Sequence, residues 1–185
     1  MKGNLITVRL ANRFMNPCRF CDGNCCISFI ITVTAFDVLR AAKASGAKPD
    51  DFAYLRRLDL LNFNDADVIE CYEKCYGKLL QESYLLVLKS HPCFFYNTVT
   101  GCKVHEKKPL ACRLYPFDEK GSYGKRAMCP LVSNAFFRFA QPSAKLFEQY
   151  RKEKAAHAKI VAACNKRKLT KEVAFRFILA QARKK

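Results

Sequence analysis

Eight cysteines in two groups are the residues of this chain best suited to chemistry. The first group reads C-R-F-C-D-G-N-C-C and places Cys18, Cys21, Cys25 and Cys26 within nine residues. The second group follows downstream and consists of Cys93, Cys102, Cys112 and Cys129. No helix, strand or hydrophobic core requires thiols at this density, whereas thiolates bind zinc and iron–sulfur clusters. The sequence therefore predicts a metal centre held by cysteines.

The adjacent pair Cys25 and Cys26 separates the first group from the C-x2-C knuckle of an ordinary zinc ribbon. Neighbouring side chains diverge, so we expect one of the two to serve a second metal or to pack behind the first. Eight thiolates suffice for two four-cysteine sites, or for one site with spare thiols. The adjacent pair and the extra cysteines favour an iron–sulfur cluster, [4Fe–4S] in the first place, and a structural zinc site is the alternative.

Three more cysteines, Cys71, Cys75 and Cys164, stand outside these groups. Cys71 and Cys75 lie four residues apart, so they could bind a metal from one face of a helix. The same spacing suits a buried helical stripe, and we favour that interpretation because free cysteine packs as a small apolar residue.

Arg113 follows Cys112 and could donate to cluster sulfurs or neutralise the charge of a cluster. A surface ion pair is the plainer role for its guanidinium. The histidines at positions 91, 105 and 157 do not form the H-E-x-x-H pattern of zinc hydrolases. P-loop, dinucleotide-binding and G-x-S-x-G motifs are also missing from the sequence. The catalytic residues and any small-molecule substrate are therefore unknown at this point.

The composition suits one domain, or one domain with an appendage. The chain has 185 residues, of which 50% are apolar, and 11 cysteines, fewer than a small disulfide scaffold carries. No apolar leader with a cleavage site and no charge-free stretch of 18 apolar residues is seen, so we expect neither export nor a transmembrane segment. The expected compartment is the cytoplasm, where thiols stay reduced and bind metals.

Positive charge is concentrated at the carboxyl-terminal end. Residues 138–185 carry 14 Lys and Arg against 3 Asp and Glu, whereas residues 1–137 carry 19 against 13. Such an end favours a polyanion as partner, either a nucleic acid, the ribosome or an acidic protein. The alternative is a solvated helical face without a partner.

The expected fold class is α+β and mostly helical. We expect a small irregular cysteine-rich metal-binding domain with a short β-hairpin over 1–140, and a basic helical extension packed on it over 141–185. Strands are predicted at 5–10, 27–33 and 83–89. A hairpin is predicted over 93–105 and should bring Cys93 and Cys102 near each other across its strands. Helices are predicted from Thr34 to Ser45 and from Pro49 with a stripe through Phe52, Leu55 and Leu58. Further helices are predicted at 64–76, from Pro109 with Cys112 on it and Pro116 after its end, and at 130–140. A helix at 143–165 is predicted to place Leu146, Tyr150, His157, Ile160, Val161 and Cys164 near one face, and a last helix from Thr170 to have Val173, Phe177 and Ile178 inside.

Two stretches of the sequence resemble a known family. They are the first cysteine group with the Asp-led helix F-D-V-L-R, and C-F-F-Y-x5-C-K-V-H-E-K-K-P-L-A-C-R-L-Y-P-F. Together they resemble the YkgJ-like cysteine-cluster family, a zinc- or iron-chelating domain, over roughly residues 16–130. The resemblance implies that the eight grouped cysteines are the metal ligands. It also implies a distant relation to the flagellin lysine-N-methylase group, whose members look to depend on an iron–sulfur cluster.

The chain departs from the family pattern at two places. The family more often spaces its first motif C-x3-C-x2-C-C, and it usually has tyrosine at the position of His105. We therefore expect His105 to be a packed or surface ring rather than a ligand. The basic end after about residue 140 lies outside the resemblance.

Three functions follow as hypotheses. The first is a metal-binding protein with a cysteine-ligated iron–sulfur cluster, with redox or cluster-dependent modification chemistry. The second is a structural zinc protein that binds RNA, the ribosome or another polyanion through residues 141–185. The third is an enzyme, an oxidoreductase or a methylase-like protein, that uses the cluster.

Overall fold

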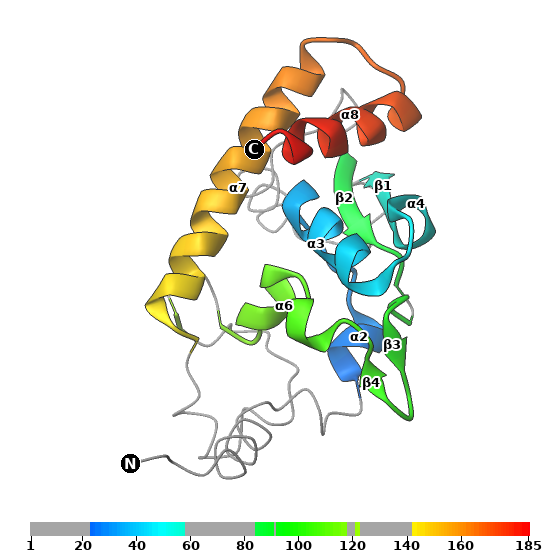
Figure 1. The fold of residues 1–185 in the computed structure, drawn as a ribbon, viewed down its shortest axis with the longest axis vertical. Helices are drawn as coiled ribbons and strands as arrows, with labels where there is room; N and C mark the ends of the chain where they lie inside the picture. Colours follow the sequence, from blue (N-terminus) through cyan, green and yellow to red (C-terminus); the bar gives the residue numbers. More distant parts are fainter. Residues whose placement is uncertain (1–22, 58–83, 91, 118–120, 123–141) are drawn as a thin grey trace.

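The computed structural model describes residues 23–57, 84–90, 92–117, 121–122 and 142–185. These residues form a mostly helical α+β fold (Figure 1). The elements in chain order are α2 (Asn24–Ser28), α3 (Ala35–Ser45), α4 (Pro49–Phe52), β1 (Ala53–Arg57), β2 (Tyr84–Leu88), β3 (Tyr96–Asn97), β4 (Gly101–Cys102), the 3-10 helix η2 (His105–Lys107), α6 (Leu110–Leu114), α7 (Ala144–Asn165) and α8 (Lys171–Arg183).

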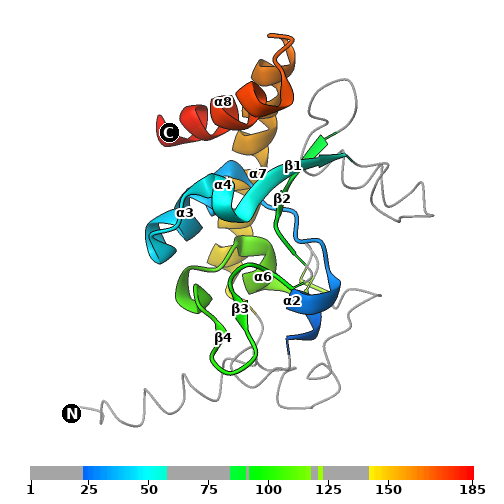
Figure 2. The same cartoon turned by 90° about the vertical axis from the view of Figure 1, so that its right-hand side faces the viewer.

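The elements gather in two groups along the long helix α7. Helices α3 and α8 lie beside the β1–β2 pair, and α2, α6 and the β3–β4 hairpin lie together at the other end (Figures 1 and 2). Helices α7 and α8 share one hydrophobic core with α3 and β1. None of the helices in the described ranges is both long enough and apolar enough to cross a membrane. The predicted division at residue 140 stays a prediction.

Helix α3 begins and ends as its sequence predicts. The Thr34 hydroxyl accepts a hydrogen bond from the Asp37 N–H, and the Asp37 carboxylate accepts one from the Thr34 N–H. This capping box satisfies two backbone donors that the first turn leaves without helical partners. Gly46 ends the helix with φ +73°, a conformation that glycine adopts without steric cost.

The predicted second helix is wrong beyond its first turn. Helix α4 ends at Phe52, and the chain continues as β1, which pairs antiparallel with β2 so that Ala53 faces Leu88. The apolar spacing at 52 and 55 indicated a helix, but Ala53 and Leu55 are buried in alternation with less buried neighbours, as in a strand. The predicted strand at 83–89 is confirmed as β2. It is the pairing partner of β1, which the local periodicity of residues 52–55 cannot reveal.

The predicted strand at 27–33 is wrong in its first half, and its second half forms only an isolated β-bridge. Helix α2 runs to Ser28, so the β-branched run begins later than its composition indicates. Thr32 then forms an antiparallel bridge with Val87, and the Val33 N–H donates to the Leu86 carbonyl at 3.0 Å. This segment connects α2 directly to the β1–β2 pair and so fixes where Cys25 and Cys26 lie.

The predicted helices at 143–165 and from Thr170 are confirmed as α7 and α8. The buried face of α7 contains most of its predicted positions, namely Tyr150, His157, Ile160, Val161 and Cys164. In α8, Ile178 is buried as predicted, but Val173 is 49% exposed. The inner face of α8 is instead built from Ala174, Phe175, Ile178, Leu179 and Ala182, because α8 packs against both α3 and α7. The predicted elements at 5–10, 64–76 and 130–140 lie outside the described residues.

His157 is a buried polar group in this core. Its Nδ1 accepts a hydrogen bond from the Ala35 N–H at 3.3 Å, and burial lowers its pKa from 6.5 to about 4. The ring is therefore neutral in the folded protein at neutral pH, with its proton on Nε2.

We expect acid to weaken the fold through His157. Below pH 6.5 the unfolded chain takes up a proton at this position, whereas the folded chain does so only near pH 4. The free energy of unfolding should therefore fall by up to about 3 kcal/mol between those values and then level off. In H157Q the amide oxygen can still accept from Ala35, but nothing titrates. Urea unfolding at pH 7 and pH 4.5 should show a smaller loss in H157Q, and equal losses in both proteins would contradict this.

Candidate metal centre

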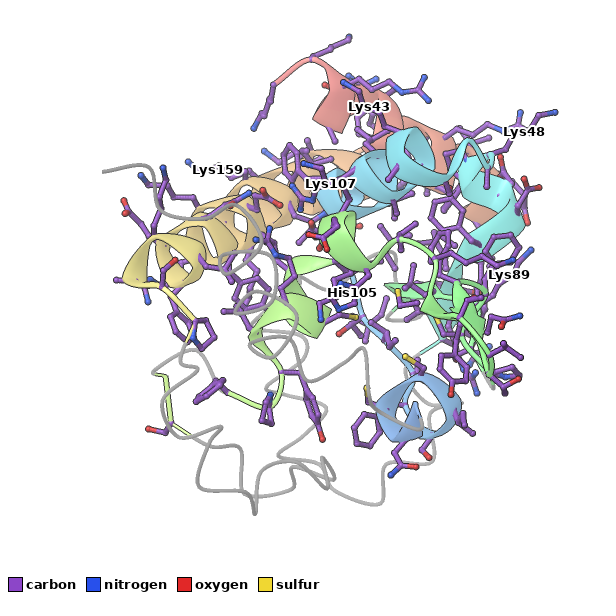
Figure 3. All side chains as sticks on the ribbon, turned by 60° about the horizontal axis from the view of Figure 1, so that its bottom comes forward. Lys43, Lys48, Lys89, His105, Lys107 and Lys159 are labelled. Carbon is purple, nitrogen blue, oxygen red and sulfur yellow. The ribbon has the colours of Figure 1, made fainter. Side chains whose placement is uncertain are left out.

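Five of the eight predicted ligands lie in the described ranges, and four separate segments bring them together. Cys25 and Cys26 lie on α2, Cys93 in the turn before β3, Cys102 on β4 and Cys112 on α6. The Cys93 N–H donates to the Cys26 carbonyl at 2.7 Å, which joins the two cysteine groups of the sequence directly. Sulfur atoms gather between α2, α6 and the hairpin (Figure 3).

Gly23 lets α2 approach the hairpin closely. It precedes α2 with φ +76°, and a Cβ at this position would overlap the Tyr96 ring. Two constraints therefore favour glycine at Gly23. One is the positive φ of its backbone, and the other is the lack of room for a Cβ beside the Tyr96 ring.

Alanine at Gly23 should destabilise the protein more than alanine at Gly46. Both residues have positive φ, but a Cβ at Gly46 would meet nothing within 4 Å. G46A should cost about 1 kcal/mol for the backbone conformation alone, and G23A should add the displacement of Tyr96. Thermal unfolding of the two variants checks this, and equal losses of stability would show that the close approach of Tyr96 has no energetic weight.

The predicted hairpin is confirmed, with a different partner for Cys102. The Asn97 side chain accepts from the backbone N–H groups of Val99 and Thr100, and Gly101 turns the chain with φ +73°. The register places Tyr96 opposite Cys102, so Cys93 precedes the paired strand. Cys93 still lies near Cys102, close enough for the charge of a Cys102 thiolate to raise the pKa of Cys93.

Helix α6 positions Cys112 between two prolines, as the sequence predicts. Pro109 is the residue before its first turn, and the helix ends before the cis Tyr115–Pro116 bond. The Tyr115 ring packs edge-on against Phe29 with 5.8 Å between the ring centroids. This contact ties the end of α6 to the segment that follows α2.

The thiols influence one another strongly. A hydrogen bond between the two thiols lowers the pKa of Cys25 to about 6 and raises that of Cys26. Their side chains thus lie close together, whereas adjacency alone had indicated that they diverge. Burial raises the pKa of Cys93 and of Cys112, and neighbouring thiol groups add to both shifts.

Lys108 supplies positive charge to this site. Its ammonium group favours the thiolate forms of Cys25 and Cys112. Sequence reasoning missed Lys108, for which the only signal was its position just before Pro109. It also treated Asp37 only as half of a capping box, although Asp37 reaches α6 through the Leu110 N–H at 2.8 Å.

The remaining candidate residues lie as follows. Arg113 is exposed on α6, and its role beside a cluster stays a prediction. His105 is half-buried in η2 (labelled in Figure 3), in keeping with the expectation of a packed ring. Cys164 is fully buried on α7, in the hydrophobic core. Cys18, Cys21, Cys71, Cys75 and Cys129 lie outside the described residues.

The donor set fits a thiophilic metal. Partly buried thiols that raise one another's pKa leave a site where thiolates repel, and a bound cation removes that repulsion. Within the described ranges, no group of three or more His, Cys, Asp or Glu side chains is arranged to hold a metal ion. The complete predicted set also requires Cys18, Cys21 and Cys129.

Comparison with known proteins gives a match to one family model. The model is named CxxCxxCC, carries the description "Putative zinc- or iron-chelating domain", and matches residues 17–130. No curated protein and no solved structure matches the chain. The matched range contains all eight grouped cysteines and every element from α2 to α6. The chain therefore belongs to the CxxCxxCC family of zinc- or iron-chelating domains.

Proposed function

We propose that the grouped cysteines of this metal-binding protein hold an iron–sulfur cluster. The observation that carries the proposal is the convergence of Cys25, Cys26, Cys93, Cys102 and Cys112 from four segments of the chain. These segments are separated by up to 87 positions in the sequence, from Cys25 to Cys112. A metal bound there would join segments that lie far apart in the sequence, and its binding energy would stabilise the fold.

The arrangement of the thiols favours a cluster over a single zinc ion. Zinc and a [4Fe–4S] cluster each take four cysteines, but within the described ranges no three thiols are arranged to hold one ion. A cluster presents several iron atoms, so its ligands can approach from a wider range of directions than those of one ion. The hydrogen-bonded pair Cys25 and Cys26 places two sulfurs on the same side of α2, where both can face such a cluster.

The protein's own contribution is to hold the thiolates and to tune their surroundings. An iron–sulfur cluster, when bound, supplies one-electron transfer. Lys108 offsets the negative charge of thiolates at Cys25 and Cys112, and burial limits the access of water to Cys93 and Cys112. Charge and exclusion of water are two of the terms by which a protein sets a cluster's potential.

The test is the metal content of protein that has never been exposed to air. Iron, acid-labile sulfide and zinc are measured on the full chain after anaerobic purification, together with visible absorbance and electron paramagnetic resonance before and after reduction. We expect a coloured protein with about four iron and four sulfide ions per chain. A colourless protein with stoichiometric zinc would overturn the iron–sulfur proposal and leave the alternative, a structural zinc site.

A second proposed function, binding of RNA, is favoured by one face of α7. Lys152, Lys159 and Lys166 are exposed and follow each other at intervals of seven residues, so they share a face at about 10.5 Å spacing. The small residues Ala155 and Ala162 lie between them and leave the face open. The nearest acid on that face, Glu148, is paired with Lys152 at 2.6 Å. A row of cations on a rigid helix fits a phosphate backbone.

Removing these lysines tests the proposal. The triple variant K152A/K159A/K166A should bind single-stranded RNA more weakly, and its salt dependence should be less steep by about two units of slope. The control K43A/K48A/K89A removes equal charge from α3, α4 and the end of β2, away from Lys159 (Figure 3). Equal losses of RNA affinity in both variants would show that RNA is attracted non-specifically by net charge and would contradict the proposed interface.

A further inference from the structure

The carboxylate of Asp37 makes more contacts than a helix cap requires. Its side chain is 1% exposed. Oδ2 accepts from the Thr34 N–H at 3.1 Å and from the Thr34 hydroxyl at 2.9 Å, which completes the cap of α3. Oδ1 accepts from the Leu110 N–H at 2.8 Å and from Arg40 Nη2 at 2.6 Å. The second oxygen therefore serves a segment 73 residues away in the sequence.

The bond to Leu110 caps the helix that carries Cys112. Leu110 is the first residue of α6, where backbone N–H groups have no partner inside the helix. Pro109 precedes it and offers no side-chain acceptor, so no local residue provides this cap. A charged acceptor at this end forms one of the stronger hydrogen bonds available to a backbone N–H. Asp37 therefore caps both α3 and α6.

Asp37 is in turn held from α7. Arg40 Nη1 and Nη2 donate to the two carboxylate oxygens of Glu153 at 3.0 and 2.8 Å. Gln149 also donates to Glu153, at 2.8 Å. Although burial opposes the charged guanidinium, these bonds raise the pKa of Arg40 and keep it cationic. A continuous chain of charged contacts thus runs from Glu153 through Arg40 and Asp37 to α6.

We propose that Asp37 is a positioning residue of the metal centre, which holds the Cys112 helix in place, and that the Arg40–Glu153 pair orients Asp37. The proposal rests on the proposed function, because it assumes that Cys112 is a metal ligand. It gives α7 a part in metal binding, although α7 contributes none of the grouped cysteines. Residues that orient metal ligands through hydrogen bonds typically change metal affinity 10- to 100-fold when they are replaced.

The experiment compares D37N with T34A. An asparagine at position 37 has one acceptor oxygen, so it cannot serve Thr34 and Leu110 together. T34A weakens the cap of α3 and leaves the bond to Leu110 intact. It therefore serves as a control for the loss of stability that D37N causes through the α3 cap. The readouts are the rate at which EDTA removes metal from the anaerobically purified full chain and the visible and paramagnetic spectra of the bound metal.

We expect metal loss to accelerate at least tenfold in D37N, with altered spectra, and to stay close to the parent rate in T34A. Equal rates in the two variants would overturn the proposal. For the outer contact, E153Q should accelerate metal loss, whereas E148Q, on the exposed side of the same helix, should not. If E153Q behaves like E148Q, α7 has no part in the centre.

The C112S variant separates this proposal from the proposed function. If C112S keeps its full complement of metal, then Cys112 is not a ligand, and the shared centre assumed in the proposed function is wrong. If C112S loses metal while folded D37N keeps it at the parent rate and with parent spectra, the function stands and the positioning role of Asp37 fails. Circular dichroism of each variant at the assay temperature confirms that the rates refer to folded protein.

Discussion

Replacing Cys112 with serine is expected to release the metal as completely as replacing Cys18. In a shared centre, the loss of a thiolate from either cysteine group opens the coordination of the same metal, because segments far apart in sequence supply its ligands. The described contacts join the groups through the Cys93–Cys26 hydrogen bond and through the mutual influence of their thiols. Metal per chain after anaerobic purification is the measurement, and we expect less than about a tenth of the parent content.

Cys164 provides the matched control for that substitution. It is fully buried among apolar residues of α7, α3 and α8, and its thiol packs in the core. C164S should cost about 1–3 kcal/mol of stability, because it buries a hydroxyl, and should leave metal content unchanged in the folded protein. A protein in which C18S lost all metal but C112S kept it would have a self-sufficient site in the first cysteine group, contrary to the shared centre.

Removal of the metal should loosen one end of the molecule and spare the other. The Cys93 N–H donates to Cys26 across the two cysteine groups, whereas the Ala174 N–H donates to Thr170 at the start of α8. Without metal, no ion holds together the two segments that carry Cys93 and Cys26. The apolar contacts of α8 remain. Hydrogen exchange should therefore accelerate at Cys93 much more than at Ala174.

The size of that effect follows from binding linkage. A metal present at 1,000 times its dissociation constant stabilises the state that binds it by about 4 kcal/mol, which corresponds to about 1,000-fold in protection. Protein from which the metal has been removed and then restored anaerobically serves as the control and should recover slow exchange at Cys93. Uniform acceleration at both amides would mean that the metal stabilises the whole fold rather than the cysteine-bearing segments.

Local signals in the sequence predicted the elements that depend on neighbouring residues. Thr34 and Asp37 lie at capping-box spacing, and Gly46 follows the helix that they begin, so α3 could be placed closely. Pro109 likewise marked the start of α6 to within one residue, because proline suits the beginning of a helix, although it lies just before the first turn. The apolar stripe of α7 was predicted for the same reason, since its period of 3.6 is visible in the sequence alone.

Elements that depend on distant partners could not be predicted in this way. The spacing of Phe52 and Leu55 fits a helix and, with Ala53, also fits alternation, and only pairing with β2 decides between them. Val173 was placed inside by periodicity, yet it is exposed, because the direction from which α3 and α7 pack against α8 is a property of the assembled core. In both cases a short apolar pattern is compatible with two structures, and long-range burial selects one.

The sequence alone determined which residues could bind metal, since the eight cysteines stand out by type and spacing and the family match covers them all. Tertiary structure decided what surrounds them. It brought the thiols of Cys25 and Cys26 within hydrogen-bonding reach of each other, placed Lys108 beside the thiols and gave Asp37 its second partner. A side chain's second hydrogen bond depends on which backbone donor the fold brings within 3 Å, and no local pattern encodes a donor that lies 73 residues away.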